Sequence, residues 1–334
     1  MANILVTGGA GYVGAHACKS LAAVGFKPTV FDNLTTGHRD FVRWGPFIQG
    51  DIRDAGSVEC AIRTSEAVAV LHFAGSAYVR ESIVDPAKYY NNNVVGTLSL
   101  LAGMRASGCS CLVFSSTCAV YGEPTEELIS EATPTAPVNP YGASKRMVER
   151  ILADFGAAYG MRTITLRYFN ACGADESAEV GEKRDPETHL IARALMALQG
   201  HVTDFAVFGT DFATQDGTAV RDYIHVSDLA DAHVAALQQL LESETGGTYN
   251  LGTGTGHSVR EVLHAVADVT GQRIPEVQAS RQLGEPARLV ANPTLARARL
   301  GFDPSRSDLH TIIRTAWHWH QRAHPKRLGA KSAT

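Results

Sequence analysis

The stretch "NILVTGGAGYVG", residues 3–14, determines the fold that we expect for this chain. An apolar run leads directly into Gly8, Gly11 and Gly14, and an amphipathic segment follows from about Ala15 to Val24. In this position, glycines permit a tight turn, a close approach of the backbone to a pyrophosphate and close packing of a helix on a strand. The free N–H groups at the start of that helix would face the anion. The stretch therefore predicts the first strand, loop and helix of a dinucleotide-binding α/β domain.

A carboxylate at the end of the next strand-like run strengthens this interpretation. "PTVFDN" ends in Asp32 and Asn33, about twenty residues after the glycines,. A carboxylate there hydrogen-bonds the ribose hydroxyls of adenosine and repels a 2′-phosphate, which favours NAD over NADP. "GDIRD" supplies Asp51 and Ile52, which we expect to flank the adenine. The alternative is a structural glycine turn in which Asp32 and Asn33 only close a turn with their side chains.

Strands and helices continue to alternate along the chain. The apolar runs "FIQGDI", "VAVLHFAG", "CLVFSSTCAVYG", "TITLRYFN" and "TYNLGTG" are separated by amphipathic segments. Such strands favour a parallel sheet covered on both faces, that is, a doubly wound Rossmann sheet of the α/β class. After Asn170 the polar segment "ACGADESAEVGEKRDPETHL" interrupts the alternation. We expect an NAD-binding Rossmann domain from residues 1–170 and 224–252, a second, smaller α/β substrate domain from residues 171–223 and 253–325, and a flexible tail at 326–334.

The composition argues against several function classes. The chain has 334 residues, of which 45% are hydrophobic and 19% charged, so it can form sizeable cores,. Its net charge is −4, and no run of Lys or Arg predicts a nucleic-acid or membrane surface,. No apolar stretch approaches the ~20 residues of a membrane span, so we expect a soluble cytoplasmic protein. Six scattered cysteines without zinc-ligand spacing predict reduced thiols and no metal site,.

A tyrosine and a lysine stand one helical turn apart in "NPYGASKRMVERILADF", residues 139–155. Asn139 is a good N-cap, Pro140 suits the first helical position, and apolar residues then recur with helical spacing,. Tyr141 and Lys145 therefore share one face of a helix. The spacing alone is equally compatible with a surface tyrosine beside a solvated lysine. Its significance depends on the neighbouring motifs.

Next to a nicotinamide cofactor, the pair acquires a chemical meaning. A phenol has a pKa of ~10, so a tyrosine base near neutral pH needs positive charge close by. Lys145 and the oxidised nicotinamide both have the required sign. Thr117, in "FSSTCAVYG", would offer a hydroxyl to the same substrate oxygen or relay its proton,. Ser115 and Ser116 are alternatives for this role.

Several motifs together carry a resemblance to a known family. "TGGAGYVG", "HFAGSAYVRES", "YYNNNVVGTLSLL", "FSSTCAVYG", "NPYGASK", "LRYFNACGA" and "GTAVRDYIHVSDLADAH" resemble the extended short-chain dehydrogenase/reductase superfamily, and specifically its UDP-glucose 4-epimerase branch. The resemblance implies a tightly held NAD and a UDP-hexose in the cleft between the domains. It implies that Tyr141 takes the proton of the sugar 4-hydroxyl, that Thr117 shares this bond and that Lys145 binds the nicotinamide ribose. A 4-keto sugar would then turn over in the site.

The resemblance also implies which residues line the site and how the chain associates. The residues that would contact the cofactor include the glycine loop and Asp32. They are Gly8, Gly11, Tyr12, Val13, Gly14, Asp32, Asn33, Asp51, Ile52, Phe73, Ala74, Gly75, Asn92, Tyr141, Lys145 and Phe169. The UDP-sugar would meet Thr117, Asn170, His189, Leu190, Val207, Phe208, Arg221, Arg281 and Glu285. Arg221 suits a bidentate diphosphate clamp, and the alternative for it is a surface ion pair with Asp222. A homodimer would form through helices near residues 89–107 and 144–159.

Some positions depart from the pattern of the family. Ala77 stands where relatives often carry a lysine, and Gln282 and Glu285 stand where the family commonly has an arginine and an aspartate, with Arg281 or Arg288 as substitutes for the missing cation. Leu289 leaves open whether an N-acetylated sugar such as UDP-N-acetylglucosamine is accepted, and UDP-xylose is also compatible with these motifs. A nucleotide-sugar dehydratase would need an Asp-Glu pair where this chain has Cys118 and Ala119. A non-catalytic NAD sensor would not need Thr117, Tyr141 and Lys145 together.

Overall fold

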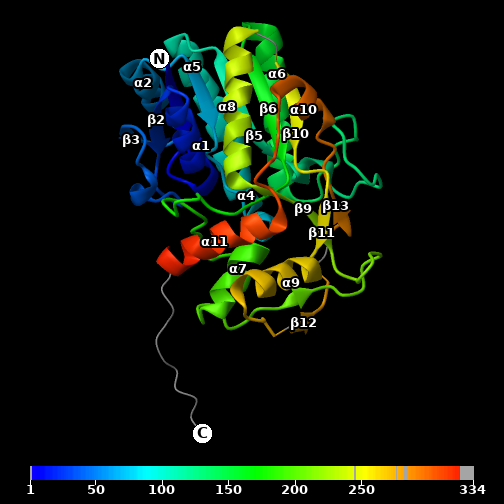
Figure 1. Ribbon diagram of the computed structural model, residues 1–334. Helices are drawn as coiled ribbons and strands as arrows, with labels where there is room; N and C mark the ends of the chain where they lie inside the picture. The colour runs from blue at the N-terminus through cyan, green and yellow to red at the C-terminus, as the bar shows by residue number, and fades with distance from the viewer. Residues whose placement is uncertain (1, 244–245, 276, 282–284, 324–334) are drawn as a thin grey trace.

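The computed structural model describes residues 2–243, 246–275, 277–281 and 285–323. A seven-stranded sheet forms the larger part, and a smaller unit lies at its lower edge in Figure 1. The sheet order is β10-β6-β5-β4-β1-β2-β3, and every neighbouring pair is parallel. The strands are β1 (Asn3–Thr7), β2 (Lys27–Asp32), β3 (Phe47–Gln49), β4 (Ala69–His72), β5 (Cys111–Thr117), β6 (Arg162–Tyr168) and β10 (Gly247–Leu251). The doubly wound sheet is confirmed.

Helices cover both faces of this sheet, which explains the continuous apolar strands. On one face α1 (Tyr12–Ala23) and α8 (Val226–Glu242) share a hydrophobic core with β1 and β6. On the other face α2 (Ala55–Ser65), α5 (Gly96–Ser107) and α6 (Pro140–Tyr159) pack in a second core. The shorter pieces between them are η1 (Arg39–Phe41), α3 (Val79–Val84), α4 (Pro86–Tyr89), the π-helical turn η2 (Tyr90–Val95) and η3 (Cys118–Tyr121). Strand order reverses between β1 and β4, where ligands bind in such sheets,.

The smaller unit is built around β9 (Val220–His225). This strand pairs with β7 (Asn170–Cys172), β11 (Gly256–Ser258) and β13 (Arg288–Leu289). The helices α7 (Leu190–Leu198), α9 (Val259–Thr270) and α11 (Leu309–Ala323) form its core, and β8 (Val207–Phe208) pairs with β12 (Gln278–Ala279). The division at residues 171–223 and 253–325 stays a prediction. Within the latter range, α10 (Thr294–Leu300) packs into the core of the larger sheet through Ala296 and Leu300.

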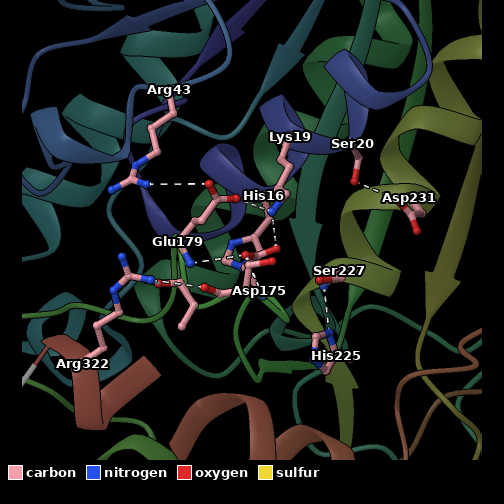
Figure 2. A network of polar contacts seen from close by, with 12 residues as sticks. His16, Lys19, Ser20, Arg43, Asp175, Glu179, His225, Ser227, Asp231 and Arg322 are labelled. Atoms are coloured by element: carbon pink, nitrogen blue, oxygen red, sulfur yellow. Dashed lines mark hydrogen bonds and ion pairs between the residues drawn. The ribbon is translucent and has the colours of Figure 1, made fainter. Parts of the chain in front are cut away.

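Ion pairs join α1 to the segment that follows β7, as Figure 2 shows. Lys19 on α1 donates to Asp175 and Glu179, both at 2.6 Å. Arg43 lies 3.9 Å from Glu179. The segment that follows β7 is therefore held against the helix that begins the dinucleotide-binding motif. The residue ranges described contain no helix long and apolar enough to cross a membrane.

Candidate functional site

The glycine loop has the geometry that a bound pyrophosphate requires. Gly8 has a φ of +73°, and a Cβ there would lie 2.5 Å from the backbone nitrogen of Ala74. A Cβ on Gly14 would lie 2.3 Å from the carbonyl oxygen of Gly8. Only glycine fits both positions, so the first turn of α1 can approach the end of β1. Gly11 is the N-cap of α1 and makes no side-chain cap bond, which leaves the first N–H groups to face an anion,.

Asp32 closes a turn with its carboxylate at the end of β2. Its carboxylate accepts from the backbone nitrogens of Ala10 at 3.1 Å and Leu34 at 2.8 Å. The turn-closing interpretation is thus part of the structure, yet each oxygen can accept a further bond from a ribose hydroxyl. A Cβ on Gly37 would lie 2.8 Å from the carboxylate, so only glycine can lie this close to Asp32. Burial raises the pKa of Asp32.

The other residues predicted to meet the cofactor have varied surroundings. Asp51 is bound by Arg53 at 2.7 Å and by Asn33 at 3.0 Å, and the Arg53 guanidinium holds the pKa of Asp51 well below its usual range. Tyr12 donates to the carbonyl of Gly173 at 2.6 Å, and thus joins α1 to the segment after β7. Ile52, Phe73, Ala74 and Phe169 are buried or half-buried, and Val13 is half-buried. Their contacts with NAD stay a prediction.

Thr117, Tyr141 and Lys145 lie together at the carboxyl end of β5. Asn139 caps α6 through a bond from the nitrogen of Gly142 at 2.8 Å, with Pro140 in the first turn, as the sequence predicts. Tyr141 and Thr117 are 7% and 6% exposed, and the neighbouring Thr117 hydroxyl lowers the pKa of Tyr141. Lys145 donates to the carbonyl of Ser115 at 2.9 Å. The structure therefore brings the three predicted catalytic side chains into one buried cluster.

The pKa shifts of Tyr141 and Lys145 show that this cluster needs positive charge from a ligand. Burial raises the pKa of Tyr141 well above its usual value, while the bond from Thr117 and the charge of Arg184 lower it. Burial lowers the pKa of Lys145 to about 8, and the charge of Glu149 raises it. The protein alone thus keeps the phenol protonated at neutral pH. A phenolate requires added positive charge in the cleft, such as the oxidised nicotinamide ring.

Asn93 is a member of the site that sequence reasoning missed. Its amide donates to Ser144 at 2.9 Å and to the carbonyl of Ser76 at 3.1 Å, and its oxygen accepts from the nitrogen of Ser76 at 2.8 Å. The predicted Asn92 donates to the hydroxyl of Ser76 at 3.0 Å. Both asparagines lie in the π-helical turn η2, a kind of turn that often occurs at functional sites,. Sequence periodicity does not predict which residue of such a turn points inward.

Arg221 and Glu285 lie together at the predicted substrate end. The guanidinium of Arg221 lies 3.8 Å from the carboxylate of Glu285. The alternative ion pair with Asp222 is wrong, because Asp222 is fully buried and accepts instead from the backbone nitrogens of Thr253 and Gly254. Arg281 pairs with the side chain of Asp211 at 3.3 Å. Gln282 lies outside the described residues.

The other predicted substrate residues differ in exposure. Val207 is 1% exposed and packs in the core of the smaller unit, so only its backbone can meet a ligand. Phe208 is 36% exposed and lies under the guanidinium of Arg80, at 5.0 Å from its ring centre. Asn170 begins β7 and Leu190 begins α7, and both are half-buried. Their contacts with a UDP-sugar stay a prediction.

His189 belongs to a charged cluster that the sequence did not indicate. Its Nδ1 lies 2.6 Å from the buried carboxylate of Glu182, which also pairs with Arg184 at 3.2 Å. Arg184 stacks on Tyr78, with 5.4 Å to the ring centre. Burial and the nearby Glu182 raise the pKa of Glu187 to about 8. Donor atoms of Glu182, Glu187 and His189 lie within 4.8 Å of one another, but Arg184 already balances charge there.

Comparisons with known proteins agree with this geometry. The NAD dependent epimerase/dehydratase family matches residues 4–252. A UDP-glucose 4-epimerase of Rhizobium leguminosarum bv. trifolii is 48% identical over 321 residues, 96% of this chain and 98% of that protein. The crystal structure of a UDP-glucose 4-epimerase from Brucella ovis in complex with NAD is 50% identical with a TM-score of 0.93, and covers 96% of this chain and 98% of that one.

A second solved structure extends the comparison to a ligand-bound site. The UDP-glucose-4-epimerase from Stenotrophomonas maltophila, with bound NAD and formylated UDP-arabinopyranose, is 40% identical with a TM-score of 0.93 over 97% of this chain and 98% of that one. Three features fit a dinucleotide: the close approach at Gly8 and Gly14, the start of α1 without a side-chain cap, and the hydrogen-bond acceptor Asp32,. The chain belongs to the NAD dependent epimerase/dehydratase family.

Proposed function

We propose that this protein is a UDP-glucose 4-epimerase, which interconverts UDP-galactose and UDP-glucose. The observation that carries the proposal is the buried cluster of Thr117, Tyr141 and Lys145 at the carboxyl end of β5. The segment Ala74–Gly75 joins this cluster to the glycine loop, since a Cβ on Gly8 would lie 2.5 Å from Ala74 and one on Gly75 would lie 3.5 Å from Lys145 Nζ. The relatives with 48% and 50% identity, each named a UDP-glucose 4-epimerase, support the same reaction.

In this proposal, the chain's own residues handle the proton and hold the reactants. Tyr141 as phenolate takes the proton of the 4-hydroxyl group, and Thr117 shares the hydrogen bond to that oxygen. Lys145 holds the nicotinamide ribose and favours the phenolate through its charge. When bound, NAD supplies a hydride acceptor for C4 and a positive ring. Tyr141 returns its proton to the 4-oxygen when the hydride returns to the opposite face, so that the net redox change is zero.

The charged substrate end suits the uridine diphosphate. Arg221 offers a planar fork of donors for a diphosphate, and its present partner Glu285 can turn to the ribose hydroxyls once a ligand takes the cation,. His189 presents its second ring nitrogen while Glu182 holds the first. Leu289, half-buried on β13 beside Arg221, is the residue whose size would limit the group at C2 of the sugar.

A direct assay tests the proposed function. The purified protein is incubated with UDP-galactose without added NAD, and UDP-glucose is followed by chromatography, with UDP-N-acetylgalactosamine and UDP-xylose in parallel. We expect UDP-glucose to form from UDP-galactose with the cofactor that the protein retains. If product forms only from another sugar, that sugar is the substrate in place of UDP-galactose. If no product forms even with added NAD, the proposed epimerase activity is refuted.

We also propose that the protein acts as a homodimer in the cytoplasm. The helices predicted to pair carry exposed apolar side chains: Val95 is 47%, Leu98 is 40% and Met147 is 46% exposed. A four-helix interface would bury them, at about 25 cal/mol per Å² of apolar surface. All six cysteines are free thiols, as a reducing compartment requires,. Leu98→Lys should convert the dimer to monomer in sedimentation, and a wild-type monomer would refute the interface.

A further inference from the structure

A buried ion pair lies one helical turn beyond the catalytic lysine. Glu149 follows Tyr141 and Lys145 on the same face of α6, and the three are spaced by four residues each,. Its carboxylate receives two bonds from Arg167 on β6, at 2.9 and 2.7 Å. Glu149 is 8% and Arg167 7% exposed. Two charges buried this far from water cost free energy unless they are well paired, so their position calls for a reason.

Ser116 connects this ion pair to the active-site end of β5. Its hydroxyl is fully buried and donates to Glu149 at 2.7 Å. Its two chain neighbours both act in the catalytic cluster. The carbonyl of Ser115 accepts the bond from Lys145 at 2.9 Å, and the hydroxyl of Thr117 lies close enough to Tyr141 to lower its pKa. Because side chains alternate along a strand, Ser116 points to the face opposite to its neighbours, toward α6, and can anchor the strand to that helix,.

The ion pair is itself part of a wider buried network. Arg167 also donates to the hydroxyl of Tyr121 at 2.9 Å, and Tyr121 donates to Asn250 on β10 at 2.7 Å. Asn250 is fully buried and donates to the carbonyl of Ile129 at 2.9 Å. The network therefore braces β5, β6 and β10 at the end of the sheet where the active site lies. Such networks keep side chains in one arrangement when each member is bonded.

The surroundings of Lys145 leave Glu149 as its anionic neighbour among the described residues. The groups near the Lys145 ammonium are the neutral buried His72 on β4, the ring of Phe114 and the carbonyl of Ser115 on β5, the backbone of Gly75, and the charge of Glu149 on α6. Glu149 in turn faces Arg167, Ser116 and, at 3.7 Å, the half-exposed Arg146. Burial alone disfavours a charged lysine at this place.

We propose that Glu149 is a positioning residue of the active site: through Ser116 it holds the end of β5 in place, and through its charge it keeps Lys145 protonated. Arg167 fixes the carboxylate without removing it from reach of Lys145. The proposal rests on the epimerase function for its kinetic readout. It gives a role to residues that contact neither substrate nor cofactor. It also explains why the buried carboxylate of Glu149 lies near the base Tyr141: Tyr141 needs positive charge nearby, and Glu149 keeps Lys145 charged.

Two variants at Glu149 separate its charge from its shape. Glu149→Gln keeps the size and removes the charge, so the alkaline limb of the pH profile of kcat should move down by about one pH unit. Glu149→Asp keeps the charge but shortens the reach to Ser116, so kcat should fall while the alkaline limb stays at its wild-type pH. An NMR titration of the Lys145 amine should show the same shift in Glu149→Gln and none in Glu149→Asp, independently of turnover.

Ser116→Ala tests the mechanical link alone. Removing one buried hydroxyl should lower kcat by about tenfold, with KM and the alkaline limb unchanged, because small displacements of reacting groups are costly. Asp228→Asn is the matched control, since Asp228 is a buried carboxylate on α8 bonded to Arg306 at 2.6 Å. It should lower thermal stability and leave both kcat and the limb as in wild type.

The outcomes distinguish this proposal from the proposed function. A wild-type protein inactive on every UDP-sugar would refute the epimerase, and the NMR titration would still decide the charge role of Glu149. An unshifted lysine titration in Glu149→Gln, or a wild-type kcat in Ser116→Ala, would overturn the positioning role. If Glu149→Gln does not fold, Ser116→Ala and Glu149→Asp decide: a fall in kcat without a shift of the limb supports the proposal, and wild-type kcat in both refutes it.

Discussion

The catalytic cluster and the substrate end are built in opposite ways. Thr117, Tyr141 and Lys145 are each less than 8% exposed and are bonded within the larger unit. At the substrate end, the side chain of His189 is 39% and that of Glu285 37% exposed. The reacting groups thus lie in a dry, braced setting where electrostatic effects are strong, whereas the groups predicted to bind the nucleotide lie where water and ligand can reach them.

The charges of the substrate end compensate one another in the ligand-free protein. Arg221 lies 3.8 Å from Glu285, and Arg184 lies 3.2 Å from Glu182. A bound diphosphate would compete with these carboxylates for the same cations. The catalytic cluster instead lacks charge, because burial favours the uncharged forms of both Tyr141 and Lys145. The comparison predicts that the proposed ligands would exchange ion-pair partners at the substrate end and supply the missing positive charge at the catalytic cluster.

Tyr141→Phe should have the largest effect and tests whether the buried cluster carries the chemistry. Loss of a general base typically costs about 10²–10⁴-fold in rate, so kcat should fall by that factor. The bound cofactor should be retained, because the ring still fills its place between Tyr89 and Thr117. Turnover is measured with UDP-galactose, and Tyr159→Phe, on a half-exposed side chain, is the control. Near wild-type turnover of Tyr141→Phe would show that Tyr141 is not the general base.

Arg221→Met should have a smaller effect that is confined to binding. Removing a charge-assisted contact should weaken UDP-sugar binding by about 1.5–3 kcal/mol, with little change in kcat. Arg281→Met is the paired variant, and its effect should be smaller because Arg281 is 41% exposed and already held by Asp211. Calorimetry with UDP measures both. A greater loss of affinity in Arg281→Met than in Arg221→Met would reverse our assignment of the diphosphate clamp.

Acid titration should affect stability rather than activity, and it distinguishes buried from exposed histidines. Burial lowers the pKa of His16 and His233 to about 4 and that of His72 to about 3. These folded values lie below the unfolded value of ~6.5, so the unfolded chain takes up protons first. Stability is therefore full above pH ~6.5 and falls as the pH drops toward 4, by up to ~1.4 kcal/mol per pH unit for each histidine.

His233→Gln measures that contribution directly. The variant should flatten the dependence of the unfolding free energy on pH between about 6.5 and 4, since one buried titrating ring is gone. The control variant His264→Gln removes an exposed ring from the smaller unit. Denaturant melts at a series of pH values provide both slopes. Equal slopes in wild type and His233→Gln would show that carboxylates alone control acid unfolding.

Local patterns were sufficient for the parts of the site that neighbouring residues build. The loop with Gly8 and Gly14 and the shared helix face of Tyr141 and Lys145 are confirmed in the structure. Each depends on backbone conformation or on helical spacing within a short segment, which a sequence encodes directly. Burial of the sheet on both faces likewise follows from continuous apolar runs such as β5,.

Long-range contacts decided the remainder. Ser116 meets Glu149 across 33 positions, and Tyr121 meets Asn250 across 129, so no local pattern predicts either bond. The inward turn of Asn93 and the core position of Val207 also follow from packing against other elements. By itself, the sequence determined the sheet, the glycine loop and the tyrosine-lysine helix, because their spacing sets their geometry. Only the tertiary structure decided which charges pair around them, because side-chain partners are chosen by proximity in the folded chain.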